Sequence, residues 1–379
     1  MNFAFTEEQL ELRDMARGFL AEHSGPDQVR AAMESELGHD PETWKRIGAE
    51  LGWPSLLVPE AYDGLGLGFV ELAALLEITG EALLCAPFFS TVCLGANALL
   101  VAADEKQKRE HLPALASGQR IVTLAVSEGD GWDADSIAAT WRPEGDGLVL
   151  SGVKRHVVDG QCADLIIVAA REAGSQGAEG IGLFAVSGLA PGLSRRVLPT
   201  MDQTRRLAEL RLEDVRVPLE ASLGAPGEAG GSLERILQRA AVCLAAEQVG
   251  GAQRALELAV AYAKERVQFG RTIGSFQAIK HKCADMMVKV ESARSAAYYA
   301  ACVAAEEDAA ELAAAASMAK AAASDAYFFT AGSALQIFGG VGFTWEYDIH
   351  LYFKRARSSQ ALLGDANAHR ESVARTLGL

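Results

Sequence analysis

Several features that mark other classes of protein are missing from this sequence of 379 residues. Basic residues are in the minority, since 35 Lys and Arg face 50 Asp and Glu and the formal net charge is −15. A general nucleic-acid binder needs basic surface for the phosphate backbone, so that class is not expected. No uncharged apolar run reaches the roughly 18–20 residues of a membrane-spanning helix. The first eight residues lack the basic stretch and apolar core of a secretory signal. We therefore expect a cytoplasmic protein with no membrane span and no nucleic-acid partner.

Cysteine pairs are also missing. None of the cysteines forms a CxxC pair, which is the usual spacing of a redox or metal motif. Reduced, mostly buried thiols are the expectation, with neither disulfides nor a metal site. The six cysteines stand at positions 85, 93, 162, 243, 283 and 302.

The residues that are present favour a large folded core, because 50% of them are hydrophobic. Residues 1–120 have a helical pattern, which begins with a capping box at Thr6 and Gln9. Pro and Gly in residues 58–66 interrupt the pattern with a loop. The length suggests two or three regions, of which 1–120 would be the first, a helical domain.

Residues 121–225 have a different pattern. Short strand-like runs at 121–126, 147–150 and 164–168 alternate with Gly and Asp clusters, which predicts a small antiparallel barrel or sandwich. Helical patterns return in residues 226–379, most clearly at 240–263 and 278–335. Helices, then strands, then helices predict an α+β fold with the sheet in the middle.

Two segments of the last region resemble the acyl-CoA dehydrogenase family. Residues 262–270 have the sequence Tyr-Ala-Lys-Glu-Arg-Val-Gln-Phe-Gly, and residues 336–343 have Gln-Ile-Phe-Gly-Gly-Val-Gly-Phe. They are similar to the flavin-binding segments of that family. Residues 5–9 and 58–66 also resemble its N-terminal domain, so the resemblance covers the whole chain. It implies an N-terminal helical domain, a middle β-barrel or sandwich and a C-terminal four-helix bundle.

The resemblance also implies FAD as cofactor and a set of residues that hold it. Arg266 would bind the pyrophosphate of the FAD in a neighbouring subunit, because a guanidinium makes charge-assisted, bidentate bonds to phosphate. Gln277 would meet the adenosine end. Gly339 and Gly340 would let the backbone come close to the cofactor. The alternatives are a surface cation at Arg266 and a plain helix C-cap at the glycines. The cofactor-binding residues predicted in this way are Arg266, Phe269, Gln277, Gln336, Gly339 and Gly340.

The middle region departs from the family pattern. Members usually have Thr-Glu-Pro followed by Gly-Ser-Asp, whereas residues 127–133 are Ser-Glu-Gly-Asp-Gly-Trp-Asp. In the family's Lys-x-Trp-Ile-Thr run, this chain has His156 for Trp and Val158 for Thr. Val158 removes a hydroxyl that would bond the flavin, although backbone amides remain. His156 is either a flavin neighbour or an ordinary loop histidine.

The family reaction needs a carboxylate base, and neither usual position has one. Counting from Gly339, one position falls on Leu363, and Asp365 lies two residues further on. The position used by another branch of the family falls on Ala240. Glu247 lies seven residues later, close to two turns, so it shares the helix face of Ala240. A carboxylate in so apolar a run needs a reason, which makes Glu247 the predicted base. The alternative is that it pairs with a cation such as Arg254 or points to solvent.

Residues 343–352 resemble a bacterial subgroup that acts on steroid side-chain and other bulky acyl-CoAs, some members of which are tetramers of two different subunits. The resemblance implies an FAD-dependent acyl-CoA dehydrogenase, a homo- or heterotetramer, with an acyl-CoA substrate and electron-transfer flavoprotein or a similar acceptor. A noncatalytic or half-site partner subunit, and an oxidase or monooxygenase, are the alternatives. His350 is expected to be structural. Small residues at Gly250 and Gly251 allow either close helix packing or a roomy pocket.

Overall fold

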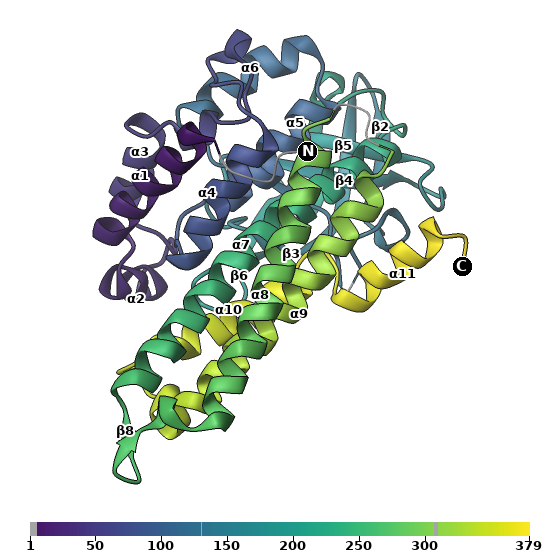
Figure 1. Ribbon diagram of the computed structural model, residues 1–379. Helices are drawn as coiled ribbons and strands as arrows, with labels where there is room; N and C mark the ends of the chain where they lie inside the picture. The colour runs from purple at the N-terminus through teal and green to yellow at the C-terminus, as the bar shows by residue number, and fades with distance from the viewer. Residues whose placement is uncertain (1–5, 130, 307–309) are drawn as a thin grey trace. The chain divides into compact units, whose positions relative to one another are not determined.

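The computed structural model describes residues 6–129, 131–306 and 310–379 (Figure 1). Phe5, of the segment 5–9, and Asp130, of the segment 127–133, lie outside the described residues. The chain forms two compact units. The helical unit contains Met1–Ala31, Phe69–Leu84 and Ala241–Leu379, and the sheet unit contains Ala32–Gly68 and Cys85–Ala240. The predicted division at residues 120 and 225 remains a prediction.

The helical unit is organised around α9, which contacts α8, α10 and α11. Helix α9 is Ala-rich and buried on most of its faces, as expected of the central helix of a bundle. Figure 1 shows α8 and α9 running side by side. The predicted helical run 278–335 is therefore two helices rather than one. The helices of this unit are α1 (Glu7–His23), α4 (Phe69–Glu81), most of α7 (Gly230–Glu265), α8 (Gln277–Ala304), α9 (Leu312–Phe338), α10 (Ile349–Ala361) and α11 (Ala366–Thr376).

The helix-start signal predicted at Thr6 is confirmed. The Thr6 side chain accepts a bond from the backbone of Gln9, and the Gln9 side chain accepts one from the backbone of Thr6. This reciprocal pair is the predicted capping box, and it begins α1.

The sheet unit contains a seven-stranded sheet in the order β1-β4-β2-β3-β7-β6, with β5 paired to β4. Strands β1 and β2 each pair with β4 in parallel, and the other pairs of this sheet are antiparallel. Trp141 and Phe184 lie in its apolar core with their ring centroids 5.8 Å apart. The strands are β1 (Val122–Ala125), β2 (Thr140–Glu144), β3 (Gly147–Val158), β4 (Leu165–Glu172), β5 (Ile181–Ser187), β6 (Leu193–Val197) and β7 (Leu207–Pro218).

Short helices complete the sheet unit, and the order helices, sheet, helices along the chain confirms the α+β prediction. The loop predicted at 58–66 contains only the short helix η2. Helix α2 (Pro26–Glu34) contains residues of both units. The other helices before, between and after the strands are α3 (Pro41–Ala49), η1 (Trp53–Ser55), η2 (Glu60–Tyr62), η3 (Phe89–Ala96), α5 (Asn97–Ala102), α6 (Glu105–Ala116), η4 (Ala134–Ser136) and η5 (Leu219–Ala221).

Helices α4 and α7 approach each other closely at two glycines. A Cβ on Gly80 would lie 2.0 Å from the carbonyl oxygen of Glu247, and one on Gly250 would lie 1.8 Å from that of Glu77. A Cβ on Gly251 would lie 2.4 Å from the ring of Tyr327. Of the two alternatives for these small residues, the structure therefore shows close helix packing. This contact fixes the backbone of α7 at Glu247.

Candidate functional site

Glu247 lies on α7 and is 8% exposed. Its Oε1 is 3.4 Å from Nη1 of Arg355, which is 4% exposed and comes from α10. Arg355 also donates a bond of 3.4 Å to the carbonyl of Leu84. The partner suggested by the sequence, Arg254, instead pairs with Glu257 at 3.2 Å. Glu247 is thus a buried carboxylate that faces a buried cation, and it does not point to solvent.

The other residues considered for the base either have no group that takes up a proton or have a structural role. Leu363 is 5% exposed and has no group that takes up a proton. The carboxylate of Asp365 caps α11 and accepts bonds from the backbone N–H groups of Asn367 and Ala368, at 3.0 and 2.8 Å. His350 packs edge-on against Trp345 with 4.8 Å between ring centroids. Burial lowers the pKa of His350, which suits the structural role expected for it.

The segment with Arg266 forms a hairpin at the end of α7. Strands β8 (Val267–Gln268) and β9 (Arg271–Thr272) pair across Phe269 and Gly270. These two residues have φ of 54° and 78°, the left-handed conformations that a two-residue hairpin turn needs. Phe269 is 92% exposed, and Figure 1 shows the hairpin at the end of the long helix. Arg266 and Gln277 are exposed too, and within the described chain the guanidinium of Arg266 has no hydrogen-bond or ion-pair partner.

The second predicted flavin segment lies at the same end of the helical unit. Phe338, the last residue of α9, stacks on Tyr262 near the end of α7 with 4.2 Å between ring centroids. Gly339 has φ of 67°, and its N–H donates to the carbonyl of Leu335, so it does close the helix. Gly340 has open space around it, since nothing lies within 4 Å of an added Cβ. Gln336 is exposed. The structure therefore brings the six predicted cofactor residues to one solvent-facing end.

Glu247 is not part of that end. It lies 18 residues before Glu265, the last residue of α7, which corresponds to about 27 Å along the helix axis. One reacting centre cannot contact both Glu247 and the residues around Arg266 of the same chain. The predicted site residues consequently form two separate groups on one helix.

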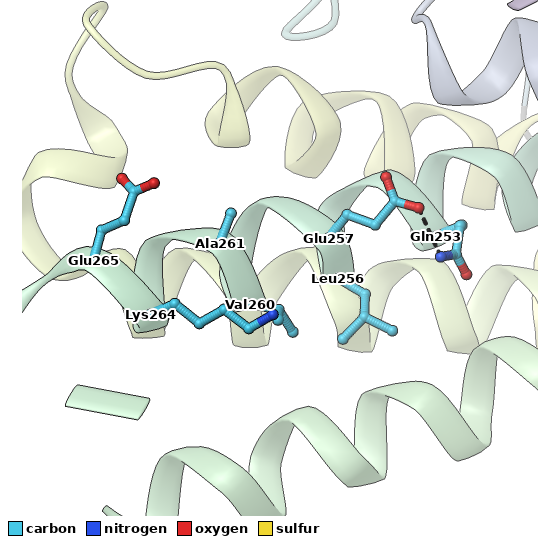
Figure 2. A pocket seen from close by; sticks show the side chains of 7 residues that line it. All are labelled: Gln253, Leu256, Glu257, Val260, Ala261, Lys264 and Glu265. Carbon is cyan, nitrogen blue, oxygen red and sulfur yellow. Dashed lines mark hydrogen bonds between the residues drawn. The ribbon is translucent and has the colours of Figure 1, made fainter. Parts of the chain in front are cut away.

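A groove of about 440 Å³ lies on α7 between these two groups (Figure 2). Its lining residues follow the three- and four-residue spacing of a single helix face. Gln253 Nε2 donates a bond of 2.9 Å to Glu257 Oε1 along this face. None of the predicted site residues lines the groove, which is formed by Gln253, Leu256, Glu257, Val260, Ala261, Lys264 and Glu265.

In the sheet unit, a buried ion pair holds the segment that departs from the family pattern. Lys154 is 0% exposed, and its Nζ lies 2.5 Å from Glu128 Oε1 and 2.9 Å from the carbonyl of Val126. The Glu128 carboxylate also accepts bonds from the backbone N–H groups of Ala138 and Ala139. Burial lowers the pKa of Lys154 to about 8, and the charge of Glu128 opposes this. The sequence contained both residues, but nothing in their spacing predicted the pair.

His156 stands next to this pair at an irregularity of β3. Its φ is 57°, and the register between β3 and β7 shifts between Lys154 and Val157. A bulge of this kind turns side chains away from their regular alternation. The residue at the position of the family's Trp is therefore held in a specific, uncommon backbone conformation. The carbonyl oxygen of Val158 accepts a bond of 2.7 Å from the hydroxyl of Thr123.

Comparison with known proteins finds three family profiles that together match most of the chain. The profiles of the acyl-CoA dehydrogenase N-terminal, middle and C-terminal domains match residues 6–119, 123–215 and 231–378. The acyl-CoA dehydrogenase IpdE2 of Mycolicibacterium smegmatis is 36% identical over 95% of each chain. Butyryl-CoA dehydrogenase of Megasphaera elsdenii has a TM-score of 0.90 and is 28% identical over 100% of both chains. A variant of the Tcur3481-Tcur3483 steroid ACAD has a TM-score of 0.87 and is 32% identical over 98% of both.

The chain belongs to the acyl-CoA dehydrogenase family. It is accordingly an oxidoreductase of the flavoprotein class that acts on acyl-CoA thioesters. Within the described ranges, none of the helices is both long and apolar enough to cross a membrane.

Proposed function

We propose that Glu247 is the general base of this acyl-CoA dehydrogenase. The observation that carries the proposal is a carboxylate almost completely buried on α7, beside the close crossing with α4. Burying a charged group is costly, and Arg355 offsets part of the cost. Glu247 would take the proton from the α carbon of the thioester while a hydride leaves the β carbon. The product is the α,β-unsaturated acyl-CoA.

FAD is the proposed cofactor, and it would accept the hydride at N5. The end of the helical unit suits such a ligand, because the Arg266 guanidinium has unused donors there and Gly340 leaves its backbone open. A pyrophosphate accepts the paired bonds that a guanidinium donates. Phe269 offers a nearly fully exposed ring at the same place. Gln277, Gln336 and Gly339 would complete the contacts.

Assembly from several copies would join the two separated groups of residues. Since Glu247 and Arg266 of one chain are too far apart for one reacting centre, Arg266 would serve the FAD beside the Glu247 of a neighbouring subunit. A homo- or heterotetramer is proposed on this basis. Electron-transfer flavoprotein or a similar acceptor would reoxidise the flavin. All six cysteines are thiols in the structure, which suits a reducing compartment such as the cytoplasm.

The proposed substrates are bulky acyl-CoAs, including steroid side-chain thioesters. The likeness to a steroid ACAD and the sequence of residues 343–352 support this class. A panel of saturated thioesters would test it: butyryl-CoA, octanoyl-CoA and a steroid side-chain acyl-CoA. We expect the steroid thioester to bleach the visible flavin absorbance fastest under anaerobic conditions.

The decisive variant is Glu247→Gln, with Glu257→Gln as the control on the exposed face of the same helix. Loss of a general base costs roughly 100-fold or more in turnover. We expect Glu247→Gln to bind flavin and fail to bleach it, whereas Glu257→Gln behaves as wild type. Full turnover by Glu247→Gln would reject the assignment. Absence of flavin in the wild-type chain expressed alone would favour the partner-subunit alternative, and rapid reoxidation by dioxygen would favour an oxidase.

A further inference from the structure

A buried lysine lies in α9 outside the predicted site. Lys320 is 0% exposed, and its Nζ bonds to Ser324 Oγ at 2.9 Å. It also reaches the carbonyl oxygens of Gly364 at 3.1 Å and Gln360 at 3.4 Å. An amine in a protein interior needs such acceptors, because leaving its polar hydrogens without partners is costly. Lys320 therefore ties α9 to the end of α10 and to the turn that follows it.

That turn has a constrained backbone. Leu363 and Gly364 have φ of 60° and 95°, and a branched aliphatic residue such as leucine rarely occupies the left-handed region. His369 Nε2 lies 2.9 Å from the carbonyl of Leu363, so this nitrogen is the donor. Lys320 holds the next carbonyl, that of Gly364. The side chains of His369 and Lys320 thus hold the uncommon backbone conformation of this turn through its two carbonyl groups.

The polar contacts of Lys320 continue through Ser324 to Gln248, the residue that follows the proposed base Glu247 in the chain. Gln248 Nε2 lies 3.1 Å from Ser324 Oγ, and Gln248 is 0% exposed. Glu247, the preceding residue, contacts Arg355 on α10. Together these contacts link three helices in a closed circuit. Gln248 and Ser324 connect α7 to α9, Lys320 connects α9 to the end of α10, and Arg355 connects α10 back to Glu247 on α7.

We propose that Lys320 is a positioning residue for Glu247, which it holds through Gln248 on one side and through α10 and Arg355 on the other. The proposal rests on the assignment of Glu247 as the base. Without the amine, the end of α10 and its turn lose their anchor, and Arg355 is no longer held in register with Glu247. Proton abstraction then slows because a base displaced by about 1 Å can lose roughly 100-fold in rate. Binding of the thioester is affected less.

The test compares Lys320→Met with Lys320→Gln and with Arg13→Met. Arg13 is also a buried cation of the helical unit, but it bonds to Glu77 and Tyr298, outside the circuit. The probe is the panel thioester that bleaches wild-type flavin fastest, and the readouts are kcat, KM and exchange of its α protons in D2O. We expect Lys320→Met to lower kcat and exchange about 100-fold with KM changed less than threefold. Lys320→Gln, which keeps hydrogen-bond donors, should recover part of this loss.

Arg13→Met should lower stability and leave α-proton exchange per folded, flavin-loaded enzyme unchanged. Equal exchange in Lys320→Met and wild type would overturn the inference, as would an equal loss in Arg13→Met. Undiminished exchange in Glu247→Gln would instead overturn the proposed function. If Lys320→Met does not fold, Lys320→Gln and Ser324→Ala test the same circuit, and wild-type exchange in both would reject it.

Discussion

Arg355 and Glu247 face each other across 3.4 Å, and both residues are more than nine-tenths buried. Removal of one member of a buried pair leaves the other charge without compensation. Arg355→Met should therefore lower the free energy of unfolding by about 3–5 kcal/mol, measured by urea titration. The double variant Glu247→Gln/Arg355→Met should recover much of the loss, since no charge is left alone. An additive double variant would show that the two charges are not coupled.

Gly80 controls the distance between α4 and the backbone of Glu247. A Cβ at this position would lie 2.0 Å from the Glu247 carbonyl, so Gly80→Ala must push the two helices apart. We expect a loss of about 1–3 kcal/mol in stability together with a fall in kcat. Gly18→Ala is the matched control, because nothing lies within 4 Å of its added Cβ in α1. That control should gain about 0.5–1 kcal/mol, as alanine is the better helix former. Wild-type stability and turnover in Gly80→Ala would contradict the close contact.

Arg266 should matter for flavin retention and little for folding. Its side chain is exposed and has no partner within the described chain. Arg266→Gln removes the guanidinium proposed to bind the pyrophosphate, and we expect FAD affinity to fall roughly tenfold or more. Equilibrium dialysis measures the affinity, and thermal unfolding of the apoprotein should not change. Lys264→Gln, which removes an exposed cation from the last turn of α7, should keep wild-type affinity. Equal losses in the two variants would point to general electrostatics.

Glu77 is the centre of a second buried charge cluster, and it should make the protein sensitive to acid. It accepts bonds from Arg13 and Arg294 and from the hydroxyl of Tyr298. Burial by itself would raise the pKa of Glu77, but the bond from Arg13 and the two cations hold it below its ordinary value. A lowered pKa stabilises the fold above the unfolded-state pKa, and this contribution is lost as the pH falls through the folded-state value.

Glu77→Gln should accordingly be less stable by about 3–5 kcal/mol at neutral pH, and the difference from wild type should shrink in acid. Urea titrations from pH 7 down to about pH 3 measure this trend. Glu81→Gln is a control on the same helix. A difference that is constant with pH would contradict the charge cluster.

Lys320 predicts a pH dependence of the opposite sign. Burial lowers its pKa to about 7 from an ordinary 10.5, against the opposing charges of Asp365 and Asp325. Between these two values the unfolded chain binds more protons than the folded chain, so this group makes stability rise with pH. The rise amounts to at most about 1.4 kcal/mol per pH unit. Relative to Lys320→Met, wild type should gain stability from pH 7 to 10, and a flat difference would show that Lys320 has no lowered pKa.

Much of the fold follows from local sequence patterns. The capping box at Thr6, the helical runs and the short strands with Gly and Asp turns depend on contacts between neighbours in the chain, so the α+β order could be predicted. The split of residues 278–335 into α8 and α9 could not, because residues 305–311, Ala-Glu-Glu-Asp-Ala-Ala-Glu, contain no Pro or Gly that would mark a break. The parallel pairing of β1 and β2 with β4 is also a long-range property, which strand patterns alone do not specify.

The sequence by itself determined the family, and it singled out the two predicted flavin segments and the unusual carboxylate at Glu247, since each is a short pattern of residue types. Only the tertiary structure decided what surrounds them. It paired Glu247 with Arg355, which lies 108 residues away, and not with nearby Arg254. It used Gly80 and Gly250 to bring α4 and α7 together, and it separated Glu247 from the end that carries Arg266. These relationships arise from packing between helices distant in the chain, and no local spacing encodes them.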